Sequence, residues 1–274
     1  MSYSPDILAL GLLSGGLDST LAVKLILDQG IKVAAVKFTT PFCLCDSRGR
    51  CYAKDVAERN GVPLTVSQTG TDYLEMLRKP KYGYGSGMNP CIDCRIYMLK
   101  KAKAYANEMA AHFIFTGEVL DERPMSQHWR ALKIIEKESG LEGKIVRPLS
   151  ALLLPETEAE KNGWVDRSKL LDIRGRCRRR QIQLASELNI ADYPCPSGGC
   201  LLTYREFAKK VKDLLDHENR VNTKDLILLR LGRHFRLGES KIIVGRNETE
   251  NKKLKALKWK DDYVFEVPGC GSPV

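Results

Sequence analysis

Residues 14–20 read SGGLDST, and the residues on either side make this stretch decisive for the fold. An apolar run, 7–13, precedes it, and an amphipathic run begins at Asp18. This order predicts a strand, a tight glycine turn and a helix. Glycine adopts backbone angles closed to other residues, and a helix N-terminus directs unpaired N–H groups and its positive dipole end at the turn. We therefore expect the loop to bind phosphate through Ser14, Gly15, Gly16, Ser19 and Thr20.

Asp18 is the unusual member of this loop, because a carboxylate repels phosphate. A magnesium ion between the two removes that repulsion, since such ions bridge carboxylate and phosphate oxygens. We therefore expect Asp18 to hold Mg²⁺, the alternative being a plain helix cap. The usual P-loop motif, GxxxxGK[ST], is absent, and the first lysine after the glycines is Lys24.

Four more strand patterns follow the loop and alternate with helical patterns. They predict an α/β protein with a doubly wound, mainly parallel five-stranded sheet, and a nucleotide at the carboxyl ends of its strands. The 274 residues, 43% of them hydrophobic, can bury a sizeable core. The later strands are predicted at 33–38, 63–67, 112–116 and 144–149, and two later helices at 165–173 and 178–188.

The pattern changes at Tyr204, which predicts a first domain over 1–203 and a small basic α+β domain over 204–274. The second domain has 16 Lys and Arg residues against 11 Asp and Glu, about half of the net charge of +10. Such an excess favours an anionic partner over a domain that only packs. Its predicted helices are 206–217 and 224–231, and its predicted strands are 234–237, 241–244 and 262–267.

The composition also restricts the class of protein. No apolar run approaches the about 20 residues of a membrane span, and the N-terminus lacks a secretory signal pattern. We therefore expect a cytoplasmic protein with no membrane partner. Nine cysteines, several of them clustered, then indicate metal or catalytic use over structural disulfides.

The motif NPCIDCR, residues 89–95, contains a cysteine pair whose place in the secondary structure can be predicted. Pro90 stands where a helix can begin, which places Cys91 and Cys94 in the first helical turn on one face. A helix N-terminus and the neighbouring Arg95 lower thiol pKa values, and a thiolate binds metal or attacks an electrophile. The pair itself leaves metal binding, redox chemistry and inert surface thiols open.

Other cysteines lie in two further clusters. YPCPSGGCLLT places Cys195 and Cys200 around a glycine turn, which would let a thiol reach a site assembled from elsewhere in the chain. FCLCDSRGRC contains Cys43, Cys45 and Cys51 at a spacing that fits no standard zinc pattern, so their role is left open.

Five arginines fall within the seven residues 174–180. Guanidinium groups bind phosphate bidentately and stay charged, and each neutralised phosphate releases counterions. The alternative is a solvated charged turn. We expect contacts with RNA or nucleotide phosphate from Arg176, Arg178, Arg179 and Arg180.

The loop SGGLDS resembles the SGGxDS loop of the PP-loop ATP pyrophosphatases, which cleave ATP between the α and β phosphates and adenylate a substrate. NPCxxC, followed by a strand, T-G-E and S-Q, is similar to the tRNA thiolation branch, tRNA 4-thiouridine synthetase and more loosely tRNA 2-thiouridylase. The resemblance spans roughly 7–203 and implies an adenine nucleotide α-hydrolase-like fold with ATP and Mg²⁺. It implies nucleotide contacts at Val36, Lys37, Phe38, Gly117, Glu118 and Gln127.

Within that branch, some enzymes hold a [4Fe–4S] cluster on a CxxC pair and one distant cysteine, and others use two cysteines for persulfide chemistry. The resemblance implies Cys91, Cys94 and Cys200 as ligands, with Cys195 in reserve for Cys200. The sulfur donor stays open between sulfide and a persulfide carrier, and the oligomeric state stays open, a dimer being one option.

The function predicted is a tRNA sulfurtransferase that adenylates a uridine carbonyl with ATP, releases pyrophosphate and replaces the oxygen with sulfur. Its catalytic residues would be Asp18, Cys91, Cys94 and Cys200, and the uridine and ring atom are left open. Two alternatives remain, an ATP-sensing nucleotide-binding module with a structural zinc–cysteine site and an adenylating amide ligase. The segment VGRNETEN resembles, weakly, an RNA-binding domain fused to such loops.

Overall fold

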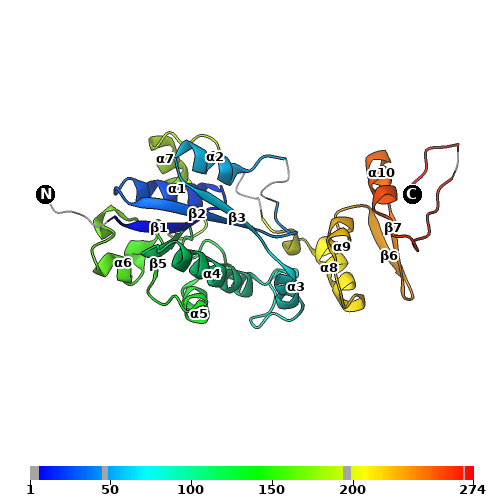
Figure 1. Ribbon diagram of the computed structural model, residues 1–274, viewed down its shortest axis with the longest axis horizontal. Helices are drawn as coiled ribbons and strands as arrows, with labels where there is room; N and C mark the ends of the chain where they lie inside the picture. Colours follow the sequence, from blue (N-terminus) through cyan, green and yellow to red (C-terminus); the bar gives the residue numbers. More distant parts are fainter. Residues whose placement is uncertain (1–5, 45–48, 194–198, 268) are drawn as a thin grey trace. The chain divides into compact units, whose positions relative to one another are not determined.

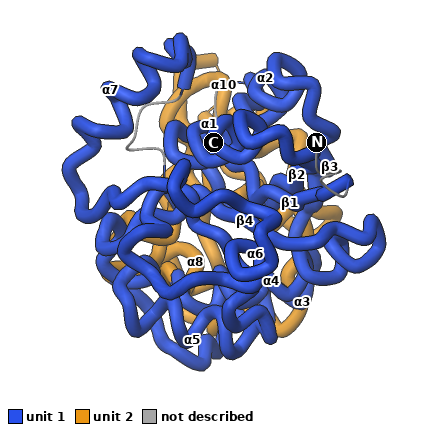
Figure 2. Tube along the Cα trace, turned by 90° about the vertical axis from the view of Figure 1, so that its left-hand side faces the viewer, with its two compact units in different colours: residues 1–85, 90–200 blue, residues 86–89, 201–274 orange. Residues whose placement is uncertain are grey.

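The computed structural model describes residues 6–44, 49–193, 199–267 and 269–274. The chain forms two compact units, one of residues 1–85 and 90–200 and the other of residues 86–89 and 201–274 (Figure 2). Among the described residues, no helix combines the length and the apolar character that crossing a membrane requires.

The first unit is built on a five-stranded sheet. Its strands are β1 (Leu8–Leu12), β2 (Lys32–Thr39), β3 (Leu64–Gln68), β4 (Phe113–Thr116) and β5 (Ile145–Val146). They stand in the order β3-β2-β1-β4-β5, and each neighbouring pair is parallel, which confirms the predicted doubly wound sheet. The order reverses between β1 and β4, and ligands of such sheets bind at the carboxyl ends of the strands at this point.

Helices cover both faces of the sheet (Figure 1). Successive strand residues point to opposite faces, so Ala9 and Phe113 pack with α1 and α2, whereas Leu10 and Ile114 pack with α4 and α5. Helix α7 packs on α1, and α3 packs on α4. The bounds are α1 (Leu17–Leu27), α2 (Tyr52–Arg59), α3 (Thr71–Arg78), α4 (Cys91–Glu108), α5 (Trp129–Ser139) and α7 (Arg179–Glu187).

The helix predicted over 165–173 is wrong. Only the single turn η2 (Arg167–Lys169) forms there, because the next residues bond to a neighbouring segment. Leu171 N–H donates to the Pro148 carbonyl at 2.9 Å, and Ile173 N–H donates to the Leu149 carbonyl at 2.8 Å. The segment before it contains η1 (Ala151–Leu153) and the short α6 (Glu158–Lys161), which a Thr157–Glu160 capping box begins.

The second unit begins with η3 (Leu201–Thr203), α8 (Arg205–His217) and α9 (Thr223–Leu228). The antiparallel pair β6 (Arg233–Leu237) and β7 (Ser240–Val244) follows, and then α10 (Glu248–Leu257). The strand predicted over 262–267 is wrong, since this segment joins no sheet in the part of the chain that the structure describes. Its alternating apolar side chains, Tyr263 and Phe265, are 89% and 81% exposed.

Candidate functional site

The glycine loop closes on itself between β1 and α1. Ser14 Oγ lies 3.0 Å from Ser19 Oγ and accepts from Gly16 N–H at 3.3 Å. The Ser19 and Thr20 hydroxyls donate to the Gly16 carbonyl at 2.9 and 3.0 Å. The loop is therefore held in shape by its own hydroxyls, at the carboxyl end of β1 where the strand order reverses.

Two glycines permit close backbone approaches at this point. Gly15 has φ +79°, and a Cβ there would lie 2.4 Å from the Ala53 backbone nitrogen. A Cβ on Gly117 would lie 2.5 Å from the Ser19 backbone nitrogen and 2.6 Å from the Asp18 carbonyl. Gly117 therefore lets the loop after β4 touch the first turn of α1, and its nucleotide contact stays a prediction.

The predicted adenine contacts lie on β2. Val36 is buried in register with Leu12, and the half-buried Phe38 packs against Tyr105 with ring centroids 6.4 Å apart. Between them, the buried Lys37 donates from Nζ to Cys51 Sγ at 3.2 Å. Adenine binding by this strand stays a prediction, and the Lys37–Cys51 contact is one that sequence reasoning missed.

Asp18 lies in a charged environment that the sequence did not predict. Arg178 Nη2 stands 3.3 Å from Asp18 Oδ2, and Arg178 Nε donates to Glu122 Oε1 at 2.9 Å. Burial and the charge of Glu122 raise the pKa of Asp18 to about 6, while Arg178 and Arg123 oppose that shift. Asp18 Oδ1 is buried and has no hydrogen-bond partner among the described residues. A buried carboxylate oxygen with no hydrogen-bond donor is suited to bind a hard cation.

The predicted phosphate-binding arginines therefore divide into two groups. Arg178 faces Asp18 and Glu122, with a side chain 17% exposed. Arg176, Arg179 and Arg180 are exposed, and Arg180 pairs with Asp172 at 2.7 Å. RNA contact by these residues stays a prediction, but Arg178 is placed to act on the nucleotide loop.

A second buried ion pair joins Arg147 to Glu118, which lies in the loop after β4. Glu118 accepts from Arg147 Nε and Thr116 Oγ1, both at 3.1 Å, and lies 3.4 Å from Arg95 Nε. Burial acts to raise the pKa of Glu118, but the guanidinium groups of Arg95 and Arg147 outweigh it and hold this pKa below its usual value.

Arg123 connects the two charged groups. Burial and the positive charges of Arg95 and Arg178 lower the pKa of Arg123, whereas Glu122 and Cys91 raise it. Each of these charged side chains either forms an ion pair with another of them or shifts the pKa of one, so they act as one electrostatic group. We call this set the arginine–carboxylate network; it consists of Asp18, Arg95, Glu118, Glu122, Arg123, Arg147 and Arg178.

The CxxC pair lies where the sequence predicted, in the first turn of α4. Tyr73 Oη donates to Cys94 Sγ at 3.5 Å. The expectation that this position lowers thiol pKa values is wrong for Cys94, because burial raises its pKa to about 11, and neighbouring Cys91 and Cys43 add to the shift. The Tyr73 hydrogen bond and Arg95 favour the thiolate but do not compensate for the lost solvation.

Cys43 and Cys200 are brought together by the fold, and both affect Tyr73 through their charge. They face each other across an isolated antiparallel bridge. Burial raises the pKa of Tyr73 well above its usual value, and negative charge on Cys94, Cys200 or Cys43 raises it further. We call Cys43, Cys91, Cys94 and Cys200 the thiol cluster. Cys43 is the member that sequence reasoning left open, and Cys195, the reserve ligand, lies outside the described residues.

The described members of the thiol cluster are not grouped closely enough to bind a single metal ion. Within the described part of the chain, no three His, Cys, Asp or Glu side chains are grouped to hold one. Thiols are the ligands that iron–sulfur clusters and soft metals take, so the chemistry of the donor set fits such a group. The remaining described thiols lie apart, with Cys177 and Cys270 exposed and Cys51 beside Lys37.

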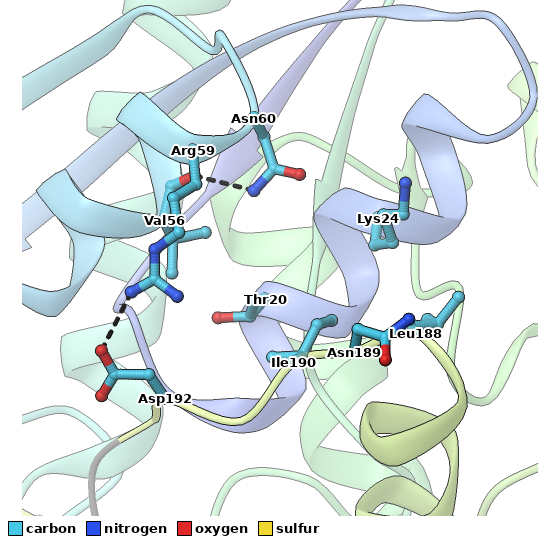
Figure 3. A pocket seen from close by; sticks show the side chains of 9 residues that line it. All are labelled: Thr20, Lys24, Val56, Arg59, Asn60, Leu188, Asn189, Ile190 and Asp192. Atoms are coloured by element: carbon cyan, nitrogen blue, oxygen red, sulfur yellow. Dashed lines mark hydrogen bonds and ion pairs between the residues drawn. The ribbon is translucent and has the colours of Figure 1, made fainter.

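A cavity of about 200 Å³ lies behind the loop, between α1, α2 and the segment after α7 (Figure 3). It shares Thr20 with the loop. Its basic side chains already have partners, since Arg59 pairs with Asp192 at 3.1 Å and Lys24 with Asp28 at 2.9 Å. The cavity is therefore not assigned to the nucleotide.

Two protein families match parts of the chain. The family model described as "Thiamine biosynthesis protein (ThiI)" matches residues 6–154. The model of the "NFACT protein RNA binding domain" matches residues 232–274.

The curated relatives are tRNA-specific 2-thiouridylases MnmA. The protein of Syntrophotalea carbinolica is 33% identical over 116 residues, which cover 38% of this chain and 32% of the relative. That of Pseudoalteromonas atlantica is 28% identical over 133 residues, 44% of this chain and 33% of the relative. The matched stretch thus spans about a third of each relative's length.

Two solved structures show more distant likeness. A 4-thiouridine synthetase–RNA complex with bound ATP has 20% identity and a TM-score of 0.41, over 81% of this chain and 52% of that one. The U34-tRNA thiolase NcsA from Methanococcus maripaludis with its [4Fe–4S] cluster has 17% identity and a TM-score of 0.38, over 82% and 70%. Neither likeness is close enough to support a functional assignment.

Proposed function

This chain belongs to the thiamine biosynthesis protein (ThiI) family, and from that premise we propose that it is an ATP-dependent sulfurtransferase that thiolates a uridine of tRNA. The family match confirms the resemblance to the tRNA thiolation branch of the PP-loop enzymes. One observation carries the proposal, the contact of the CxxC helix with the loop after β4. Arg95, which follows Cys94, has its Nε 3.4 Å from a Glu118 carboxylate oxygen, and the neighbouring Gly117 is in close backbone contact with the first turn of α1. Activation by ATP and delivery of sulfur would thus occur within one site.

The first half of the reaction is assigned to the glycine loop. The uridine carbonyl oxygen attacks the α-phosphorus of ATP, pyrophosphate leaves, and the oxygen becomes part of a good leaving group. The N-terminus of α1 and the N–H groups of the loop would bind the phosphates. Asp18 would hold Mg²⁺ through its unpartnered Oδ1, and the ion, when bound, neutralises phosphate charge.

The arginine–carboxylate network supports this half. Arg178 and Arg123 place positive charge beside Asp18, where negative charge develops on the leaving pyrophosphate. Glu122 holds Arg178 in position through its Nε. These arginines therefore act on the nucleotide, in addition to the exposed ones that the sequence assigned to RNA.

The second half is assigned to the thiol cluster. A sulfur nucleophile displaces AMP from the activated carbon and leaves a thiouridine. Cys91, Cys94 and Cys200 would hold a [4Fe–4S] cluster, which supplies iron-bound sites for the incoming sulfur. Because the pKa of Cys94 is about 11, its thiol must release a proton on ligation, so assembly should depend on pH. Sulfide or a persulfide carrier would supply the sulfur.

RNA binding is assigned to basic and aromatic groups on each unit. The first unit exposes Arg176, Arg179 and Arg180. In the second unit, residues matched by the RNA-binding model include Phe235, 53% exposed, and Tyr263, 89% exposed. Exposed aromatic rings stack on unpaired bases, and basic residues contact phosphate. We propose that 204–274 is an RNA-binding domain, that tRNA is the partner, and that the protein acts in the cytoplasm.

The test separates the three candidate functions by their products. α-Labelled ATP is incubated with unmodified tRNA, sulfide and anaerobically purified protein. AMP formation together with a thionucleoside, identified by mass spectrometry of the digested tRNA, supports the proposal. ADP, or no tRNA-dependent turnover with a colourless zinc protein, supports the ATP sensor, and turnover that requires ammonia supports the amide ligase. An unchanged thionucleoside profile in cells lacking the gene would also refute the proposal.

A further inference from the structure

Gln181 carries a buried carboxamide that no described side chain or backbone group satisfies. The residue is 0% exposed, and neither Nε2 nor Oε1 has a hydrogen-bond partner among the described residues. Burial of a polar group without a partner costs free energy, and such groups are rare in folded proteins. A hydrophobic side chain would fill the position without that cost. The carboxamide therefore needs an explanation outside the packing of the helix.

Helix α7 places Gln181 beside the start of α1, on which it packs. Arg178, at the N-cap of α7, stands 3.3 Å from Asp18 through its Nη2. Beyond the other end of α7, Asn189 lines the cavity behind the loop together with Lys24 (Figure 3). The two helices therefore run side by side in the same direction. Gln181 comes one turn after Arg178, so it lies opposite the first turn of α1.

The residues that share a face with Gln181 support this position. Side chains three and four residues apart on a helix are neighbours, so Gln181 stands between Arg178 and Ala185. Ala185 belongs to a buried cluster that also contains Leu17 and Leu21 of α1. The carboxamide thus lies in the contact between the two helices, at the end where the nucleotide loop begins.

A second buried polar atom without a partner lies in that turn of α1. Asp18 Oδ1 has no hydrogen-bond partner among the described residues, whereas Asp18 Oδ2 faces Arg178. The carboxylate oxygen and the carboxamide of Gln181 are both unsatisfied and do not bond to each other. Mg²⁺ keeps several waters when it binds to a carboxylate, and waters bridge polar groups that do not touch. A hydrated Mg²⁺ on Asp18 would therefore supply partners to both residues.

We propose that Gln181 is a positioning residue of the magnesium site, acting on the water shell of the Mg²⁺ that Asp18 holds. Its Oε1 accepts a hydrogen bond from a metal-bound water, and its Nε2 donates to a water beside it. Outer-shell partners of this kind fix the orientation of the groups that touch the ion. The inference rests on the proposed function for the use of Mg²⁺ with ATP, and it adds a residue outside the loop motif and the arginine run.

The experiment compares Gln181→Met with Gln183→Met, an exposed glutamine of the same helix that donates to Glu187. Mg²⁺ is titrated calorimetrically into each protein in the presence of α,β-methylene-ATP, which cannot be cleaved between its α and β phosphates. Gln181→Met should bind Mg²⁺ about 10- to 100-fold more weakly, which is the usual cost of losing an outer-shell partner. Gln183→Met should match the wild type.

Two further measurements separate this role from a purely structural one. Gln181→Met removes the unsatisfied carboxamide, so the ligand-free protein should melt at least about 2 °C higher than the wild type. Its binding of the analogue in EDTA should be unchanged. Gln181→Glu keeps an acceptor oxygen at the same reach and should bind Mg²⁺ more tightly than Gln181→Met, whereas a residue needed only for packing would tolerate a buried carboxylate worse than methionine. This variant also serves if Gln181→Met fails to fold.

Each outcome decides the proposal. Equal Mg²⁺ affinity in Gln181→Met and the wild type would overturn it, as would an equal loss of analogue binding with and without Mg²⁺. A lower melting temperature of Gln181→Met would also overturn it, because the carboxamide would then have a partner within the protein. Weaker Mg²⁺ binding by Gln181→Met in a protein that does not thiolate tRNA would support the role of Gln181 while refuting the proposed function. A wild-type protein that binds no Mg²⁺ with the analogue would refute both.

Discussion

Replacement of Gly117 by alanine tests whether the contact between the two loops at the switch point matters for ATP chemistry. The new Cβ would lie 2.5 Å from the Ser19 backbone nitrogen, whereas ordinary contact begins at 3.4 Å. The obstructing atoms belong to the backbone of Asp18 and Ser19, so no side chain can turn away. The loop after β4 and the first turn of α1 must therefore separate by about 0.9 Å, the difference between these distances.

Two magnitudes follow from this displacement. Overpacking of this kind costs about 1–3 kcal/mol, and a domain of this size loses roughly 2–4 °C of Tm per kcal/mol. A shift of about 1 Å in a reacting group costs on the order of 10²-fold in rate. Gly117→Ala should therefore lose far more tRNA-dependent AMP formation than stability.

The assay measures AMP release from labelled ATP and, in parallel, thermal unfolding. Gly271→Ala is the matched control, because a Cβ there meets no described atom within 4 Å. If Gly117→Ala keeps AMP formation within about threefold of the wild type and unfolds at the same temperature, the steric argument is wrong. If activity and stability both collapse, the glycine serves the fold and gives no information on alignment.

Asp18→Asn should stabilise the fold at pH 7 by at most about 3 kcal/mol while abolishing AMP formation. The pKa of Asp18 is raised from 3.8 to about 6, so the ionised carboxylate destabilises the folded state above pH 6. The gain in melting temperature of Asp18→Asn over the wild type should therefore fade as the pH drops from 6 to 3.8. Arg178→Gln removes the guanidinium that pairs with both Asp18 and Glu122, and it should lower the free energy of unfolding in urea by about 3–5 kcal/mol. Arg180→Gln removes only an exposed ion pair and should lower it by under about 1 kcal/mol. Equal costs would contradict the buried network. With a pKa of about 11, about one in a thousand Cys94 thiols is ionised at pH 8. Iodoacetamide should therefore alkylate the exposed Cys177 long before Cys94, and peptide mass spectrometry at successive times measures this order.

The magnitudes assigned to Asp18 and Arg178 belong to one coupled group. Removing Arg178 leaves two carboxylates facing each other, so a second substitution, Glu122→Gln, should recover part of the loss. Recovery in the double variant is expected because the remaining charge repulsion disappears, and it is measured as the interaction energy of a double-mutant cycle. Strict additivity of the two substitutions would argue that Glu122 and Arg178 act separately.

Sequence patterns were sufficient where structure depends on neighbouring residues. The apolar run before SGGLDST and the amphipathic run after it predicted β1, the loop and α1, because strand and helix periodicity are local properties. Pro90 before the CxxC pair placed both thiols in the first turn of α4 for the same reason. Local patterns misled at 165–173 and 262–267, where helical and alternating spacing occurs without the partners that regular structure needs.

Only the tertiary structure could bring Cys43 to Cys200, or Arg178 to Asp18. These pairs are far apart in the chain, and their approach depends on the order of strands in the sheet and on the paths of the loops between them. The pKa of Cys94 shows the same limit: the helix N-terminus predicts a lowered value, but burial beside Tyr73 raises it to about 11. Charge effects read from neighbouring residues are local, whereas desolvation is set by everything that packs around the group. The sequence alone thus determined the chemistry that the residues can perform, and the fold decided which of them act together.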